Sequence, residues 1–234
     1  MTSEERLSKA GGFAAIVGTA ILAVATWLHP LGAHPNDAPA AFAEYAGERF
    51  WVAIHLAQLA GVVLAAAGLL ALAWRLRRSA PVAATFGSVA LVVAMALAAA
   101  TQAVDGVALK AMVDCLADAD AASRAAVYEA TFAVRQLEIG LGSIAALFTG
   151  LAAALYGAAQ LRETGAPRWL GCLGIGSGAA TFAGGIVQAH DGFSDATMAL
   201  SMPGGVLLAL WITLSGWRML RGSVGAAAVG VDAA

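Results

Sequence analysis

Residues 51–74 read WVAIHLAQLAGVVLAAAGLLALAW, a run of 24 residues without Asp, Glu, Lys or Arg. A helix needs about 20 consecutive, mainly apolar residues to cross the hydrocarbon core of a bilayer. This run is long enough, and its two most polar side chains, His55 and Gln58, lie close to its beginning. The run therefore predicts a membrane-spanning helix with a polar pair at one end.

Five further apolar runs of similar length occur along the chain. The six expected spans cover about residues 10–28, 51–74, 80–104, 139–159, 169–189 and 196–217. Pro203 lies in the last span, so we expect its first part to be kinked or non-helical. Only 12% of the residues are charged, against about 25% in an ordinary soluble domain. We expect an all-α polytopic membrane protein with a single six-helix domain over residues 1–222 and a flexible tail over 223–234.

The basic residues predict how the protein sits in its membrane. Cytoplasmic loops carry an excess of Lys and Arg. With the N-terminus inside, nine of the 13 Lys and Arg residues fall on the inner face. The remaining four fall on the outer face: Arg49, Lys110, Arg124 and Arg135. This predicts a multi-pass protein of the cytoplasmic membrane with both termini in the cytoplasm. The net charge of −2 and the lack of a dense basic patch exclude a nucleic-acid-binding protein.

Two similar stretches, TQAVDG at 101–106 and VQAHDG at 187–192, each follow a long apolar run. A shift of 86 residues aligns them, and it also aligns the Ala-Pro pairs at 80–81 and 166–167. One interpretation is that the hairpin of the second and third spans is duplicated, in parallel, as the fourth and fifth spans. Asp105 and Asp191 would then face each other near the outer surface. The other interpretation is chance similarity in a sequence rich in Ala and Gly.

Polar residues three apart occur at the outer ends of four spans. Such residues share one face of a helix, and ionisable groups at membrane depth usually face the bundle interior or a watery cavity. The pairs predict an outward-facing polar pocket, and the alternative is that these groups are solvated or form interhelical hydrogen bonds that only stabilise the fold. The candidate ligand-binding residues are His55, Gln58, Gln102, Asp105, Glu138, Gln188, His190 and Asp191.

The outer connections also show helical patterns. Asn36-Asp37 followed by Pro39 predicts the start of a short helix over residues 40–49. Apolar residues recur at helical spacing between 106 and 120, which predicts an amphipathic helix lying over the outer mouth of the bundle. Ser123 is expected to cap a helix that continues into the fourth span, with a break or a protruding first section.

Several functions are compatible with such a pocket. It could bind or transport a small, amphipathic or lipid-like ligand without any cofactor, or the protein could be a non-catalytic accessory protein that docks a partner. Imidazole and carboxylate also suit zinc, iron or copper, and a membrane enzyme could use them as ligands at the outer face. The candidate metal ligands are His29, His55, His190, Asp105 and Asp191. His55 and His190 could instead be the axial ligands of a b-type haem.

Three short motifs carry a resemblance to a known class of proteins. The first span ends in His29-Pro30, the second opens with WVAIH at 51–55, and AVDG at 103–106 ends the third. In this layout the chain resembles small, uncharacterised six-helix bacterial membrane proteins. The resemblance covers most of the chain and implies the fold and the membrane location, but no activity.

Overall fold

The computed structural model describes residues 1–30 and 32–228, with side chains up to residue 222. The described residues form helices and contain no strand, so the all-α prediction is confirmed. The elements are α1 (Ser3–Trp27), α2 (Ala38–Gly47), α3 (Trp51–Leu76), α4 (Pro81–Ala103), the π-helical segment η1 (Val104–Leu109), α5 (Lys110–Asp118), α6 (Arg124–Gln160), α7 (Arg168–Asp191) and α8 (Asp195–Ala228).

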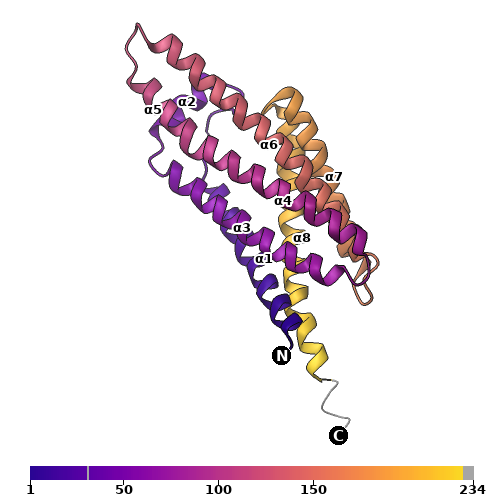
Figure 1. Ribbon diagram of the computed structural model, residues 1–234. Coiled ribbons are helices and arrows are strands. Elements are labelled where there is room, and N and C mark those ends of the chain that lie inside the picture. The colour runs from indigo at the N-terminus through magenta and orange to yellow at the C-terminus, as the bar shows by residue number, and fades with distance from the viewer. Residues whose placement is uncertain (31, 229–234) are drawn as a thin grey trace.

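Six helices are long and apolar enough to cross a membrane, as in a multi-pass membrane protein. They are α1, α3, the continuous helix α4–η1–α5, α6, α7 and α8. The prediction of six spans is therefore confirmed. Figure 1 shows that α1 begins and α8 ends at the same end of the bundle. We call this the terminal end and the opposite one the cap end. The predicted tail begins within α8, which continues to Ala228, and residues 229–234 lie outside the described residues.

Glycines let the long helices approach each other closely. A β-carbon on Gly157 of α6 would lie 2.6 Å from the carbonyl oxygen of Gly171 on α7. One on Gly178 of α7 would lie 2.6 Å from the carbonyl oxygen of Gly150. Small residues at helix interfaces allow this packing in lipid, where no hydrophobic force drives helices together. The glycine-rich sequence of α7 is therefore explained by close packing against α6.

The cap consists of α2, α5 and the first turns of α6. Helix α6 is one continuous helix of 37 residues, about 55 Å long at 1.5 Å per residue, and its beginning projects past the other spans (Figure 1). The cap has its own apolar cluster, which includes Phe42, Trp51, Leu109 and Val113. Helix α5 is amphipathic as predicted, but it continues the line of α4 (Figure 1) because its apolar face packs on α2.

Polar contacts fix both ends of α2. The side chain of Asp37 caps the helix by accepting a hydrogen bond from the amide of Ala40, at 3.2 Å. At the other end, Lys110 Nζ donates to the carbonyls of Tyr45 and Ala46, at 3.1 and 3.0 Å. A cation at the C-terminus of a helix interacts favourably with the helix dipole. Helix α2 starts two residues before the predicted range and is anchored to α5.

Two local expectations differ from the structure. Ser123 precedes α6 but makes no capping bond to it; its hydroxyl donates instead to the carboxylate of Asp120, at 2.6 Å. The hydroxyl of Ser123, which was expected to cap α6, is therefore bound by Asp120 in the turn before the helix. Pro203 lies inside α8, which is already helical from Asp195 onwards.

Candidate functional site

The central contact of the cap end joins His55 of α3 to Asp105 of η1. His55 is 2% exposed, and its Nε2 lies 2.9 Å from Oδ2 of Asp105. Its Nδ1 lies 2.7 Å from the backbone carbonyl oxygen of Trp51. Because a carbonyl oxygen only accepts hydrogen bonds, Nδ1 carries a hydrogen and donates it. Nε2 and the carboxylate therefore share one proton between them.

The π-helical segment holds Asp105 against His55. A β-carbon on Gly106 would lie 2.5 Å from the β-carbon of His55, so the two backbones meet only because residue 106 has no side chain. The indole Nε1 of Trp51 donates to the backbone carbonyl of Asp105, at 2.9 Å. Single π-helical turns occur frequently at functional sites. Asp105-Gly106 is thus a fixed part of a continuous helix, and not a turn.

His29 approaches this contact from the loop after α1. Its ring centroid lies 5.2 Å from that of His55 and 4.9 Å from that of Trp51. Nδ1 of His29 donates to the backbone carbonyl of Pro30, at 3.0 Å, which leaves the lone pair of the neutral ring on Nε2. Burial lowers the pKa of His29 below its usual value, although the Pro30 carbonyl and Asp105 act in the opposite direction. Donor atoms of His29, His55 and Asp105 all lie within 4.8 Å of one another.

Arg135 and Glu138 of α6 form the opposite wall. Arg135 is 3% exposed and donates to the backbone carbonyl of Pro35, at 2.8 Å, and to the hydroxyl of Tyr45, at 3.2 Å. Its Nη1 lies 3.6 Å from Oε2 of Glu138, and its guanidinium lies over the ring of Phe193, 5.0 Å from the centroid. Burial raises the pKa of the Tyr45 hydroxyl, which therefore remains neutral at neutral pH.

A cavity of about 460 Å³ lies between these walls. Its lining residues come from two loops and five helical elements: His29, Pro30, Ala33, Pro35, Tyr45, Gln58, Asp105, Arg135, Glu138, Phe193, Met198 and Met202. Oδ1 of Asp105 and Oε2 of Glu138 are buried and have no hydrogen-bond partner among the described residues, and neither has Oε1 of Gln102. Buried polar atoms in proteins are usually hydrogen-bonded. All three orphaned atoms are acceptors, and two of them belong to residues that line the cavity, Asp105 and Glu138. Arg135 supplies a positive charge 3.6 Å from Oε2 of Glu138 but makes no hydrogen bond to it.

The predicted site residues fall into two groups. His55, Gln58, Asp105 and Glu138 lie together at or beside the cavity, and Gln102 lies one helical turn before Asp105. The other three are on α7, where Gln188 is buried and donates to the backbone carbonyl of Ile139 on α6, at 3.3 Å. His190 and Asp191 are exposed at the end of α7, and the structure does not bring them to the buried His55.

The two Asp-Gly pairs of the sequence repeat have different surroundings. Asp105 lies within the continuous helix α4–η1–α5, whereas Asp191 is the last residue of α7. Gly192 follows it with φ of +62°, a left-handed conformation that ends the helix. The repeat remains a sequence hypothesis, and its two copies do not build equivalent polar sites.

Sequence reasoning missed the loop contacts that close the cavity. The side chain of Asn36 accepts from the amide of Phe193, at 3.0 Å, and donates to the carbonyl of Asp191, at 3.4 Å. His34 Nε2 lies 3.0 Å from Oδ1 of Asp195. These contacts hold Phe193 at the cavity. They join residues more than 150 positions apart, so only the polar composition of the loop could have indicated them.

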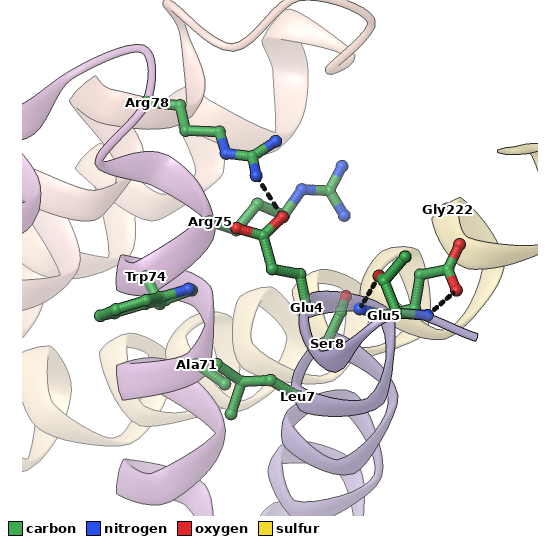
Figure 2. Close-up of a pocket in the computed structure, with 10 residues that line it drawn as sticks. Glu4, Glu5, Leu7, Ser8, Ala71, Trp74, Arg75, Arg78 and Gly222 are labelled. Atoms are coloured by element: carbon green, nitrogen blue, oxygen red, sulfur yellow. Dashed lines mark hydrogen bonds and ion pairs between the residues drawn. The ribbon is translucent and has the colours of Figure 1, made fainter.

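The terminal end presents a different chemistry. A cavity of about 300 Å³ lies there between the start of α1 and the end of α3 (Figure 2). Its charged groups have partners: Arg78 binds the carboxylate of Glu4, and Thr2 and Glu5 form a capping box at the start of α1. Nearby, Glu163 binds both Arg75 and Arg218. Among these two cavities, buried carboxylate oxygens without a hydrogen bond are thus a feature of the cap-end one.

Comparison with known families identifies the chain at the family level. A family model described as Domain of unknown function (DUF4386) matches residues 10–217, which is most of the 234 residues. The chain belongs to the DUF4386 family. The match includes four spans completely, most of the first and the last, and every residue that lines the cap-end cavity. The resemblance to uncharacterised membrane proteins is therefore confirmed, with DUF4386 as the family.

Two further comparisons found nothing similar. No curated protein and no solved structure matches the chain. The family description names no activity, so a function for this DUF4386 protein has to be argued from its cavity.

Proposed function

We propose that the cap-end cavity binds an amphipathic small molecule whose polar group donates hydrogen bonds or carries a positive charge. The observation that carries this proposal is that two residues lining the cavity, Asp105 and Glu138, each have a buried carboxylate oxygen without a hydrogen-bond partner among the described residues. Leaving such an acceptor unsatisfied costs about 1–3 kcal/mol or more. A ligand that donates to these oxygens recovers that free energy.

The apolar side of the cavity supports an amphipathic ligand. Phe193, Met198 and Met202 also line the cavity, and methionine side chains adapt to irregular ligand shapes. A neighbouring cavity of about 490 Å³ lies between α1 and α3, is lined by apolar residues and reaches Leu28, which directly precedes His29. A polar cavity next to an apolar one suits a polar head with a hydrocarbon chain.

Binding is better supported than transport. Between the cavity and the terminal end, the polar side chains of the spans bind one another. Gln160 accepts from Trp211 Nε1 at 2.9 Å and donates to Ser215 at 3.0 Å, and the hydroxyls of Tyr156 and Ser88 lie 3.1 Å apart. A polar solute would have to break these contacts to cross. The excess of basic residues at the terminal end further supports a cavity on the outer side.

Native mass spectrometry of the full-length protein released from maltoside micelles tests the proposal. The probes are decylammonium and decylphosphate, which share a chain and differ in the charge of the head. We expect decylammonium to remain bound and decylphosphate to be lost. Met198→Trp fills the cavity and should abolish retention, whereas Val206→Trp, on the lipid-facing side of the same helix, should not. Equal retention of both probes, or retention by Met198→Trp, would contradict the proposal.

A further inference from the structure

We propose that His29, His55 and Asp105 bind a divalent transition-metal ion at the wall of this cavity. The inference deepens the proposed function and rests on it, because the metal would lie at the wall of the same cavity and would be bound by Asp105, whose Oδ1 has no hydrogen-bond partner among the described residues. Two imidazoles and one carboxylate are a ligand set used by zinc and by iron(II).

The donor atoms are close to ligand spacing. Zinc binds imidazole nitrogen and carboxylate oxygen at about 2.0–2.2 Å, which places neighbouring donors about 3–3.5 Å apart. Nε2 of His55 and Oδ2 of Asp105 are 2.9 Å apart, slightly closer than this spacing, so the two donors would separate by a few tenths of an ångström around a metal ion. All three donors lie within 4.8 Å, so His29 has to move by about 1 Å to complete the set. His29 lies on the loop after α1 and outside any helix, which permits such a shift.

The outer contacts of both histidines are those of metal ligands. A metal-bound histidine almost always donates its other ring N–H to a carbonyl or a carboxylate, which fixes the tautomer. Nδ1 of His55 donates to the Trp51 carbonyl and Nδ1 of His29 to the Pro30 carbonyl. Each ring therefore leaves Nε2 for the metal.

Asp105 is also placed as a ligand would be. Its backbone is fixed by the Trp51 indole, and Gly106 allows His55 to approach. Its Oδ1 is buried and has no hydrogen-bond partner among the described residues. Without metal, a single proton lies between His55 and Asp105, and a cation that binds there takes the place of that proton.

Three protein ligands leave at least one coordination position open. The cavity that His29 and Asp105 line also contains Glu138 and Arg135, so water or a polar group of a bound molecule can reach that position. The simpler alternative is that the His55–Asp105 contact only ties α3 to η1. That alternative predicts no affinity for metal.

Cobalt(II) titration of the chelator-stripped, full-length protein in detergent distinguishes a metal site from a purely structural His55–Asp105 contact. Co²⁺ is the probe because its visible absorption reports coordination, and Zn²⁺ should displace it. We expect one equivalent of Co²⁺ to bind. His29→Gln and Asp105→Asn should each weaken binding by more than about 100-fold, since the loss of contacts outside the ligand shell alone costs 10–100-fold. Circular dichroism shows whether each variant is folded, and His29, which lies on a loop and outside any helix, is the safer of the two.

His190→Gln is the matched control, because His190 is exposed and lies outside the cluster. It should bind Co²⁺ as the unchanged protein does. No cobalt spectrum, or equal weakening by His190→Gln and His29→Gln, would overturn the inference. Decylammonium retention by the stripped protein is measured in parallel. If decylammonium is retained but Co²⁺ does not bind, the metal site is wrong and the proposed function stands. If Co²⁺ binds but decylammonium is not retained, the proposed function is wrong and the metal site stands.

Discussion

At position 106 the side chain is a single hydrogen, and the β-carbon of His55 lies only 2.5 Å from where a β-carbon would be. Gly106→Ala therefore has to push His55 away from Asp105. We expect the variant to lose about 1–3 kcal/mol of stability, the usual cost of overpacking a well-packed site. Thermal unfolding in detergent measures the loss.

Gly140→Ala on α6 is the control for this substitution. No described atom lies within 4 Å of a β-carbon placed there, and alanine is favoured over glycine in a helix by about 0.5–1 kcal/mol. Gly140→Ala should thus leave the unfolding temperature unchanged or raise it. If Gly106→Ala did the same, His55 would not be packed against η1 as described.

At the scale of residues, the sequence predicted part of the site. The polar pairs His55/Gln58 and Gln102/Asp105 stand out against an apolar helix face, and the structure places these residues at or near one cavity. The role of Gly106 could not be predicted, because its closeness to His55 depends on a residue 51 positions away. The interaction of His29 with His55 depends on the path of a loop, which no spacing reveals.

Between elements, the close interface of α6 with α7 can be tested by a single change. A side chain on Gly178 would enter the backbone of α6 at Gly150 and Ala154, at 2.6 Å. Gly178→Leu should lower stability by at least about 1–3 kcal/mol, visible as a lower unfolding temperature and a smaller monodisperse fraction. Gly176→Leu on the same helix meets no described atom within 4 Å and should behave like the unchanged protein. Similar losses in both variants would contradict the packing.

The attachment of α2 to α5 makes a separate prediction. Lys110 holds the last carbonyls of α2, so Lys110→Met should loosen α2 by about 1–3 kcal/mol, the usual contribution of a charged hydrogen bond. Hydrogen exchange should become faster in residues 38–47 and stay unchanged in α7, which serves as the internal reference. Unchanged exchange in residues 38–47 would show that Lys110 does not anchor this helix.

At the scale of elements, hydropathy predicted the six spans, because each must be apolar over its whole length. It did not predict that α4 continues through η1 into α5. The π-helical turn takes up about one residue more than an α-helical turn. The apolar pattern of α5 is therefore out of register with that of α4, and the sequence looks like the end of one helix and the start of another. Ser123 was a reasonable cap by type, but Asp120 competes for its hydroxyl.

For the whole molecule, the distribution of arginines predicts that the terminal end is cytoplasmic and the cap is outside. Cys115 is an exposed, free cysteine on α5 of the cap, and Cys172 is one near the start of α7. A membrane-impermeant maleimide should label Cys115 in intact cells, and Cys115→Ser should abolish the labelling while Cys172 stays unlabelled. Labelling that requires permeabilised cells would invert the orientation.

The arrangement of the spans could be predicted only in part. Composition and length indicate six helices in a membrane, but the contacts that define neighbours are glycine-to-backbone approaches, such as Gly157 with Gly171. Many glycines in this chain are equivalent by sequence, and their pairing depends on the rotation of each helix. Polar side chains from four spans were expected to line one pocket. Those of α3, η1 and α6 meet at the cap-end cavity, whereas the exposed end of α7 does not contribute to it.

The central claim is that polar side chains from α3 and η1 meet beneath the cap, and a double-mutant cycle on His55 and Asp105 tests it most directly. The free energy of unfolding of the metal-free protein is measured for His55→Gln, Asp105→Asn and the double variant. Contact at 2.9 Å predicts a coupling of about 1–3 kcal/mol, and the pair His190→Gln with Asp105→Asn should be additive. Additivity of the His55 and Asp105 changes, within about 0.5 kcal/mol, would contradict the account.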